Sequence, residues 1–232
     1  MARRRKGRWK GRLLAAVLLL ALAGSAYGWW RAIHWTPDAA QYPVQGVIVG
    51  AREGAVDFAG LAAQGAGFAY LEASRGADER DAQFGANFRV ASASPLPVGI
   101  VHDYDPCSSA EAQSANLVTI VPRDTRLLPP VIALDRLASD CEDPMSEARL
   151  ESELMTFVNQ VEGHVGQPVV LKISPAFEAR YGVAKSLERN LWLERDWLEP
   201  DYAGRPWTLW TANSQLHGKA SEEPIRWVVL QP

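Results

Sequence analysis

From Tyr42 onward, hydrophobic residues follow two alternating spacings, one typical of strands and one typical of helices. Short runs rich in β-branched residues are followed, after a turn, by segments whose apolar positions recur every three or four residues. Five strands are expected at 46–50, 68–74, 98–105, 129–135 and 168–174, with helices after them at 56–65, 82–92, 108–121, 143–165 and 175–181. Because strands that alternate with helices usually pair in parallel, the pattern predicts an α/β fold with a parallel sheet.

The helical spacing stops after Tyr181. Three further strands are expected at LERNLWLE (187–194), WTLWTAN (207–213) and IRWVVLQP (225–232), joined by turn-rich segments. Five βα units followed by three bare strands make eight strands, which is enough to close a barrel. The sequence therefore predicts a single TIM-like β/α barrel over residues 42–232.

Residues 1–36 have a different pattern. Residues 13–30 carry no charge and follow seven basic residues, which predicts a transmembrane anchor or a signal segment. The small residues 24–26 would allow cleavage, and the protein would then be secreted. Retention as an anchor is favoured by aromatic residues typical of a membrane interface: Tyr27, Trp29, Trp30 and Trp35. We expect a single-pass protein of the bacterial inner membrane, with its barrel in the periplasm or outside the cell.

Charge is divided unevenly along the chain. Eight of the 24 basic residues precede Asp38 and no acidic residue does, so 16 basic residues face all 27 acidic ones in the rest of the chain. That part has a net charge of about −11, which argues against nucleic acid as a partner.

Cysteine and histidine usage bears on disulfides and metals. The two cysteines, Cys107 and Cys141, each follow a predicted strand by a few residues, so a disulfide between them is expected, with two free thiols as the alternative. The four histidines are scattered and show no metal-ligand spacing. We expect no metal and no cofactor.

Several motifs, together with the order of elements, resemble glycoside hydrolase family 25, the muramidase-type lysozymes that cut peptidoglycan. Residues 43–76 are similar to the family's G-x-D-V-S-x-x-Q-G opening and its later F-A-Y-I-K-A-T-E-G. LPVGIVHDYDP (96–106) resembles L-x-x-G-A-Y-H-F-F-x-P, LPPVIALD (128–135) resembles L-P-P-V-L-D-V-E, and WTLW (207–210) resembles W-x-x-W-Q. The resemblance implies a barrel of five βα units and three strands, with peptidoglycan or another envelope glycan as partner.

This sequence departs from the family's motifs at the acidic positions. The family's first Asp falls on Ile48 and the following Ser on Gly50. The two acids of D-x-E fall on Ala133 and Asp135, and the acid of the last strand falls on Arg226. Because glycoside cleavage normally needs two carboxyl groups, the resemblance implies a domain that is catalytically impaired and acts by binding.

Two alternatives remain open at this stage. One is an active muramidase with a rearranged site that uses Asp135 and Glu72. The other is a structural envelope protein with a closed barrel mouth filled by side chains. In the leading interpretation, the old cleft could also bind an unknown protein partner instead of peptidoglycan. In the simpler interpretation of the same residues, Glu72 pairs with Arg75, and Asp135 caps a loop or pairs with Arg136.

Four residues are candidates for ligand contacts, because they are placed near strand ends or are aromatic: His102, Tyr104, Trp192 and Trp210. Each also has a simpler interpretation. His102 would be a hydrogen-bonded barrel histidine, and the tryptophans would belong to the core. Asp103 and Asp105 are expected to be solvated loop charges.

Overall fold

The structure, a computed structural model, describes residues 5–121 and 126–232, and it divides into two units, 1–35 and 36–232. The first unit is one helix, α1 (Arg5–Ile33). Residues Trp9–Ile33 have a mean hydropathy of 1.7 and are long and apolar enough to cross a bilayer, a test that a signal sequence also passes.

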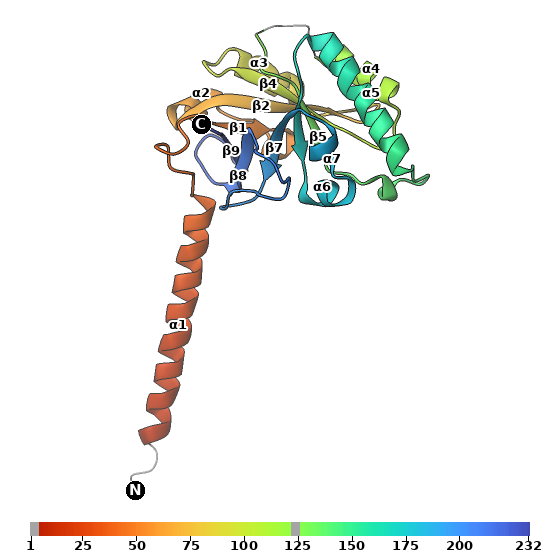
Figure 1. Cartoon of the computed structure of the whole chain (residues 1–232). Coiled ribbons are helices and arrows are strands. Elements are labelled where there is room, and N and C mark those ends of the chain that lie inside the picture. The colour runs from red at the N-terminus through yellow and green to blue at the C-terminus, as the bar shows by residue number, and fades with distance from the viewer. Residues whose placement is uncertain (1–4, 122–125) are drawn as a thin grey trace. The chain divides into compact units, whose positions relative to one another are not determined.

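The second unit is a barrel of eight strands (Figure 1). Its strands run around the ring in the order β1-β9-β8-β7-β6-β5-β4-β2, and pairing of β2 with β1 closes it. A two-residue strand, β3, extends the end of β2. The strands are β1 (Gln45–Val49), β2 (Ala66–Arg75), β3 (Glu79–Arg80), β4 (Val98–Asp103), β5 (Val131–Leu134), β6 (Val170–Ile173), β7 (Asn190–Glu194), β8 (Leu209–Leu216) and β9 (Ile225–Leu230).

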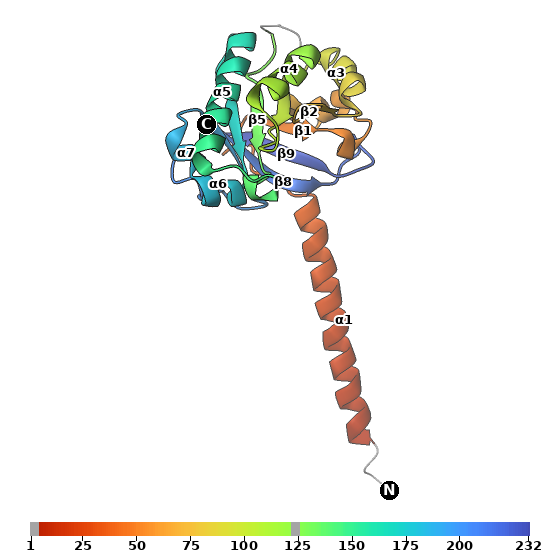
Figure 2. The ribbon, with the colours of Figure 1, turned by 90° about the vertical axis from the view of Figure 1, so that its right-hand side faces the viewer.

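Helices follow the first five barrel strands, as the sequence predicts. They are α2 (Phe58–Ala63), α3 (Phe84–Ser92), α4 (Ala110–Ile120), α5 (Glu147–Val165) and α6 (Pro175–Tyr181), with a short α7 (Val183–Ser186). Two 3-10 turns, η1 (Ala51–Glu53) and η2 (Ala138–Asp140), follow β1 and β5. Figure 2 shows α4 and α5 packed together outside the barrel, and no helix occurs between Leu191 and Trp227, a range that the structure describes in full.

Three details of the prediction are wrong. The sheet is not parallel throughout, because β9 runs antiparallel to both β8 and β1. The turn-rich segment before β9 holds no helix, and a short direct connection joins antiparallel strands. Two helices also begin later than predicted: α4 begins at Ala110, capped by Ser109, and not at residue 108, and α5 begins at Glu147, capped by Ser146, and not at residue 143.

The barrel interior is apolar and closely packed. Trp192 at its centre is fully buried, donates its indole N–H to Thr211 at 2.8 Å, and lies edge-on to Tyr70 at 5.1 Å between ring centroids. Glycine at position 99 makes room for Tyr70, because a Cβ there would lie 2.1 Å from its ring. This interior cluster forms the floor under the site described next: Ile48, Phe68, Tyr70, Val101, Val131, Ala133, Val170, Trp192, Leu209 and Val228.

Candidate functional site

A cavity of about 750 Å³ opens at the carboxyl ends of the parallel strands, the end at which barrel enzymes carry their active sites. Twelve of its 16 lining residues are charged. The third interpretation from the sequence, a barrel mouth closed by side chains, is therefore wrong.

Strand alternation explains why this rim is charged. Side chains two residues apart on a strand point to the same face. The interior residues Tyr70, Val101, Val170, Trp192 and Val228 belong to the apolar floor. The residues two positions nearer the mouth on the same strands are all charged, and all line the cavity: Glu72, Asp103, Lys172, Glu194 and Arg226.

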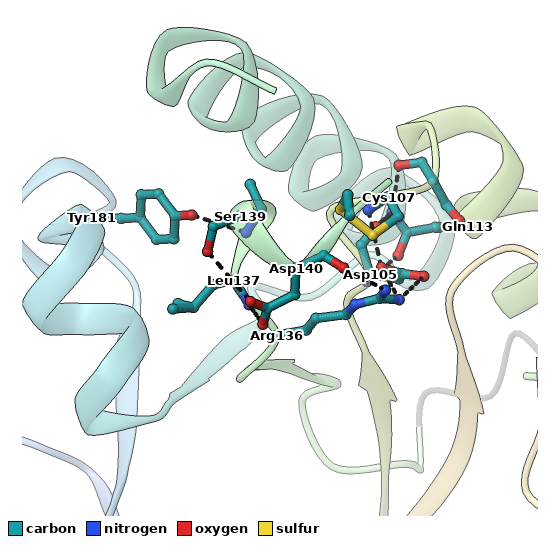
Figure 3. Close-up of a disulfide and its surroundings, with 11 residues drawn as sticks. Asp105, Cys107, Gln113, Arg136, Leu137, Ser139, Asp140 and Tyr181 are labelled. Atoms are coloured by element: carbon teal, nitrogen blue, oxygen red, sulfur yellow. Dashed lines mark hydrogen bonds and ion pairs between the residues drawn. A yellow bond between two sulfur atoms is a disulfide. The ribbon is translucent and has the colours of Figure 1, made fainter. Parts of the chain in front are cut away.

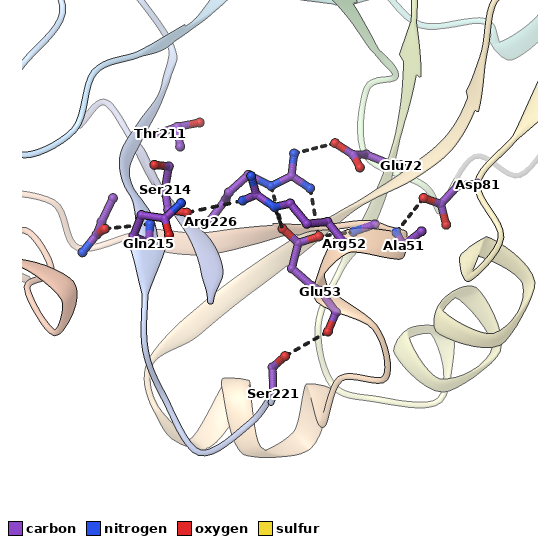
Figure 4. Close-up of polar contacts among 12 residues, drawn as sticks. Ala51, Arg52, Glu53, Glu72, Asp81, Thr211, Ser214, Gln215, Ser221 and Arg226 are labelled. Atoms are coloured by element: carbon purple, nitrogen blue, oxygen red, sulfur yellow. Dashed lines mark hydrogen bonds and ion pairs between the residues drawn. The ribbon is translucent and has the colours of Figure 1, made fainter. Parts of the chain in front are cut away.

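Arg226, at the start of β9, is the centre of the largest polar network in the described mouth (Figure 4). Its guanidinium donates to both carboxylate oxygens of Glu53, at 2.9 and 3.0 Å, and to Glu72 at 2.5 Å. The Glu53 side chain is fully buried and also accepts the Gly50 N–H at 2.7 Å. Arg226 therefore holds two carboxylates in fixed positions, one below the rim and one on it.

Electrostatics favour the ionised form of both partners on the rim. Burial alone would raise the pKa of Glu72, but the hydrogen bond and charge of Arg226, helped by Lys172 and Arg52, lower it. Burial opposes the charge of Arg226 as well, yet Glu72 and Glu53 raise its pKa further. The expected pairing of Glu72 with Arg75 is wrong, because Arg226, distant in sequence, reaches Glu72 across the barrel mouth.

Gly50 is required by this arrangement. A Cβ at Gly50 would lie 2.0 Å from Oε2 of Glu72, well inside contact distance. The backbone of Gly50 is extended, so space and not conformational freedom accounts for glycine here. Any side chain at residue 50 would therefore force Glu72 to leave its present position.

Two further ion pairs lie around the rim. Arg75 donates to Asp103 at 2.9 Å, and Lys172 pairs with Glu194 at 2.6 Å. Burial and the nearby charge of Glu72 raise the pKa of Asp103, although Arg75 and Lys172 act in the opposite direction. The expectation that Asp103 is a solvated loop charge is wrong, since it is the last residue of β4 and lines the cavity.

Asp135 follows β5 at the mouth and is exposed. Among the described residues it makes no ion pair and no side-chain hydrogen bond, so the expected pairing with Arg136 is wrong. Arg136 instead forms a two-pronged pair with Asp105, at 3.0 and 3.1 Å (Figure 3). Asp105 is thus an ion-paired rim residue, and not a solvated loop charge.

The predicted disulfide is confirmed. Cys107 and Cys141 are bonded with a Cα–Cα distance of 5.4 Å, and the bond joins the loops that follow β4 and β5 (Figure 3). Asp105 lies close to both sulfurs, but sulfurs joined in a disulfide are not thiolate ligands, so this group does not fit a metal ion.

His102 and Tyr104 point away from the cavity, toward the helix layer. His102 is buried, shares hydrogen bonds with Ser74 at 2.8 Å and Gln113 at 3.4 Å, and lies 4.9 Å from the ring of Phe157. Burial lowers the pKa of His102 to about 4, so its ring is neutral at physiological pH. The ring of Tyr104 also packs on Phe157, at 5.7 Å, which leaves that side chain only 2% exposed at the cavity rim.

Trp192 and Trp210 are core residues and not ligand platforms. Trp192 lies in the barrel floor, beneath the charged rim. Trp210 faces outward on β8, donates to the carbonyl of Arg195 at 2.8 Å, and packs edge-on against Tyr42 and Trp207. Of the four ligand candidates from the sequence, the cavity is bordered only by Tyr104, and its ring is almost fully buried.

Comparisons with known proteins agree with this architecture. The model of the family described as "Glycosyl hydrolases family 25" matches residues 47–218, which is most of the chain. The chain belongs to glycosyl hydrolase family 25. A family 25 glycosyl hydrolase from Bacillus anthracis is 25% identical, with a TM-score of 0.77 over 86% of this chain and 93% of that one.

More distant structures share the family 25 fold. A bacterial lysozyme from Streptomyces coelicolor is 19% identical, with a TM-score of 0.71 over 82% of this chain and 92% of that one. A muramidase from Trichobolus zukalii is 18% identical, with a TM-score of 0.69 over 82% and 94%. A search of curated protein sequences finds no match.

The sequence did not identify Glu53, the buried partner of Arg226, or four of the charged residues that line this family 25 cavity: Asp103, Lys172, Glu194 and Arg226. Strand alternation was the available signal, because each of the last four lies two residues beyond, or two before, an apolar interior position on its strand. Glu53 had no such signal, since it lies in the 3-10 turn η1.

Proposed function

We propose that this family 25 domain binds peptidoglycan through the charged cavity and does not cleave it at a measurable rate. Peptidoglycan is the expected partner because the family resemblance implies it, and one of the similar structures is a bacterial lysozyme. The observation that carries the loss of cleavage is the Arg226 network. Arg226 holds Glu72 ionised in a fixed ion pair, and the positions where the family motifs place acids, Ile48 and Ala133, are apolar floor residues.

Glycoside cleavage needs a protonated acid near the leaving oxygen and a second carboxyl group at the anomeric centre. Glu72 has a lowered pKa and does not suit the first role, and its pairing with Arg226 removes it from the second. Asp135 has no second carboxyl group at position 133, which is Ala133 in this chain, so the paired carboxyl groups of the family motif are missing. It is also one methylene shorter than glutamate, and a displacement near 1 Å costs on the order of 10²-fold in rate. These facts oppose the muramidase that uses Asp135 and Glu72.

One observation favours a second candidate function, hydrolysis by a different pair. Asp103 has a raised pKa and Glu72 a lowered one, and the charge of Glu72 contributes to the shift of Asp103. Two carboxyl groups whose pKa values are pushed apart are a typical acid and base pair. In this alternative Asp103 would protonate the leaving oxygen, after release from Arg75.

The N-terminal helix completes the proposal. We propose that α1 is retained as a single-pass anchor, with the family 25 domain on the outer side of the bacterial inner membrane. The supporting facts are the apolar stretch Trp9–Ile33 and the basic residues before it. Membrane fractionation should leave the full-length chain in the bilayer fraction, and a mature chain that starts near Tyr27 would refute the anchor.

The deciding experiment uses purified peptidoglycan sacculi. Turbidity loss or dye release measures cleavage, a pull-down with the same insoluble material measures binding, and an active family 25 muramidase serves as positive control. We expect binding without cleavage. Cleavage that Asp135→Asn abolishes would restore the rearranged muramidase, and cleavage that Asp103→Asn abolishes would establish the second candidate. If the protein is absent from the fraction that is pulled down with the sacculi, the proposed binding is refuted.

A further inference from the structure

The lining of the cavity is unsuited to a bare sugar chain. Sugar rings bury their apolar faces against aromatic side chains, because those faces gain by leaving water. Tyr104 is the one aromatic residue among the 16 that line the cavity, and it is 2% exposed with its ring against Phe157. No ring face is therefore offered to a sugar by the described lining.

The cavity is lined mainly by charged side chains and not by aromatic rings. Seven acidic and five basic residues line the cavity. Most of the basic groups are matched by rim acids, through the pairs of Arg75 with Asp103, Lys172 with Glu194, Arg226 with Glu72 and Arg136 with Asp105. A ligand that suits such a surface must itself carry charge.

Three lining acids have no ion-pair partner among the described residues: Asp135 and Asp140 lie near the end of β5, and Glu79 lies in β3, opposite Arg75 in the strand pairing. Asp135 is exposed and has no ion-pair partner among the described residues. The carboxylate of Asp140 in η2 accepts hydrogen bonds from Leu137 N–H and the Ser139 hydroxyl, while Arg136 donates only to the Asp140 backbone carbonyl, at 3.3 Å. A positively charged group of a ligand would be stabilised near the end of β5, because no cation of the described residues forms an ion pair with the carboxylate of Asp135 or of Asp140.

Basic groups with spare donors lie toward β1 and β2. The side chains of Arg75 and Arg52 are 61% and 55% exposed. Arg75 uses Nε and Nη2 for Asp103, and a guanidinium has five N–H donors, so its remaining donors face solvent at the rim. A carboxylate is the group that such a fork binds best.

We infer that the cavity recognises a short peptide that carries both a free ammonium group and a free carboxylate, and not the glycan strand. The ammonium binds at Asp135 and the carboxylate at Arg75. Peptide stems of peptidoglycan have this chemistry, so the inference rests on the proposed function and specifies which part of the polymer is bound.

The test measures binding of soluble probes to the full-length chain in non-ionic micelles by calorimetry. One probe is the peptide L-Ala-γ-D-Glu-L-Lys with free ends. The second is the same peptide with both amines acetylated, and the third is a chain of four N-acetylglucosamine units. We expect the free peptide to bind at least about threefold more tightly than either other probe, the scale of one partly solvated ion pair. Raising the salt concentration from about 0.05 M to 0.5 M should weaken the free peptide most, the acetylated peptide less, and the uncharged sugar chain not at all.

Variants locate the contacts. Asp135→Asn should weaken the free peptide about threefold or more and leave the acetylated peptide unchanged. Asp201→Asn is the matched control, because Asp201 has an 88% exposed side chain, pairs with Arg195, and does not line the cavity. Arg75→Gln should weaken both peptides, since both keep their carboxylates.

Three outcomes would overturn the inference: equal affinity for the free and acetylated peptides, tighter binding of the sugar chain, or no binding of the free peptide. The sacculus pull-down separates these outcomes from the proposed function. Sacculi that bind while the free peptide does not would leave the proposed function standing and remove the peptide inference. If the free peptide binds but the sacculi do not, the proposed function is refuted.

Discussion

The floor and the rim of the barrel lie two residues apart along the same strands, yet apolar packing holds the floor together and ion pairs hold the rim. The floor is a continuous apolar cluster in which Ile48 and Ala133 pack like any core residue. The rim is a ring of ion pairs arranged around a cavity. A family 25 fold therefore needs its interior packing, whereas the chemistry at its mouth can change without changing the barrel. The predictions below test whether floor and rim are as separate as this comparison suggests.

The largest expected effect lies in the rim. Arg226→Met should destabilise the protein by about 3 to 5 kcal/mol, because it removes the ion-pair partner of Glu72 and leaves the fully buried carboxylate of Glu53 with only the exposed Arg52 and one backbone N–H. Chemical denaturation followed by tryptophan fluorescence measures the loss. Arg75→Met is the matched control and should cost under about 1 kcal/mol, since Arg75 is 61% exposed. Equal effects of the two variants would show that Arg226 contributes no more to stability than an exposed arginine on the rim.

Removal of the disulfide should have the next largest effect. Cys107 and Cys141 are 34 residues apart, and the loop-closure model gives between about 3 and 4 kcal/mol for a loop of this length. The double variant Cys107→Ala/Cys141→Ala should lose this much free energy of unfolding, and reduction of the wild type should reproduce it. A reductant that also destabilises the double variant would point to another cause.

The pH dependence of stability should reveal His102. Burial gives His102 a pKa of about 4 in the folded chain, below the usual 6.5, so the unfolded chain binds the proton more readily. The stability that the neutral ring supports is complete above about pH 6.5 and is lost as the pH falls toward 4, by about 3 kcal/mol. Unfolding measured between pH 7.5 and 4.5 should show this slope.

His102→Asn is the comparison for that slope. The variant should be less stable at pH 7.5, because the contacts of the ring with Ser74, Gln113 and Phe157 change. It should nevertheless lose less stability on acidification. The raised pKa of Asp103 acts in the opposite direction in both proteins, so it cancels in the difference. Parallel pH profiles would mean that His102 does not control acid sensitivity.

The smallest effect is expected at Asp135. Asp135→Asn should change the free energy of unfolding by less than about 0.5 kcal/mol, because the residue is exposed and makes no ion pair among the described residues. A loss of more than about 2 kcal/mol would show that this carboxylate supports the fold, and the separation of floor from rim would fail there.

The architecture was predictable because it depends on local pattern. The two hydrophobic spacings located every barrel strand and the helices between them, with errors of a few residues at the ends. The disulfide followed from the equivalent positions of Cys107 and Cys141 after neighbouring strands. Strand direction at β9 was missed, although the turn-rich segment between Leu216 and Ile225 is too short for the crossover that parallel strands need.

The site was harder to predict, because its contacts join residues distant in sequence. Proximity in the chain suggested Arg75 for Glu72 and Arg136 for Asp135, yet the barrel places Arg226 beside Glu72 and Asp105 beside Arg136. The choice between the two interpretations of His102 could have been made from the sequence. Its neighbour Val101 is interior, so the alternation of β4 turns His102 outward and Asp103 into the cavity.

The absence of a side chain at Gly50 makes the history of this site difficult to reverse. The family motif has serine there, but a Cβ at this position would meet the Glu72 carboxylate at 2.0 Å and displace it from Arg226. A Gly50→Ser change made first would therefore break the ion pair between Glu72 and Arg226 before any acid had been restored. Restoring an acid first would add a buried charge to a floor that has none to match it. Under the proposed loss of hydrolysis, each single step back would pass through a less stable protein, so selection for stability alone would oppose the return of activity.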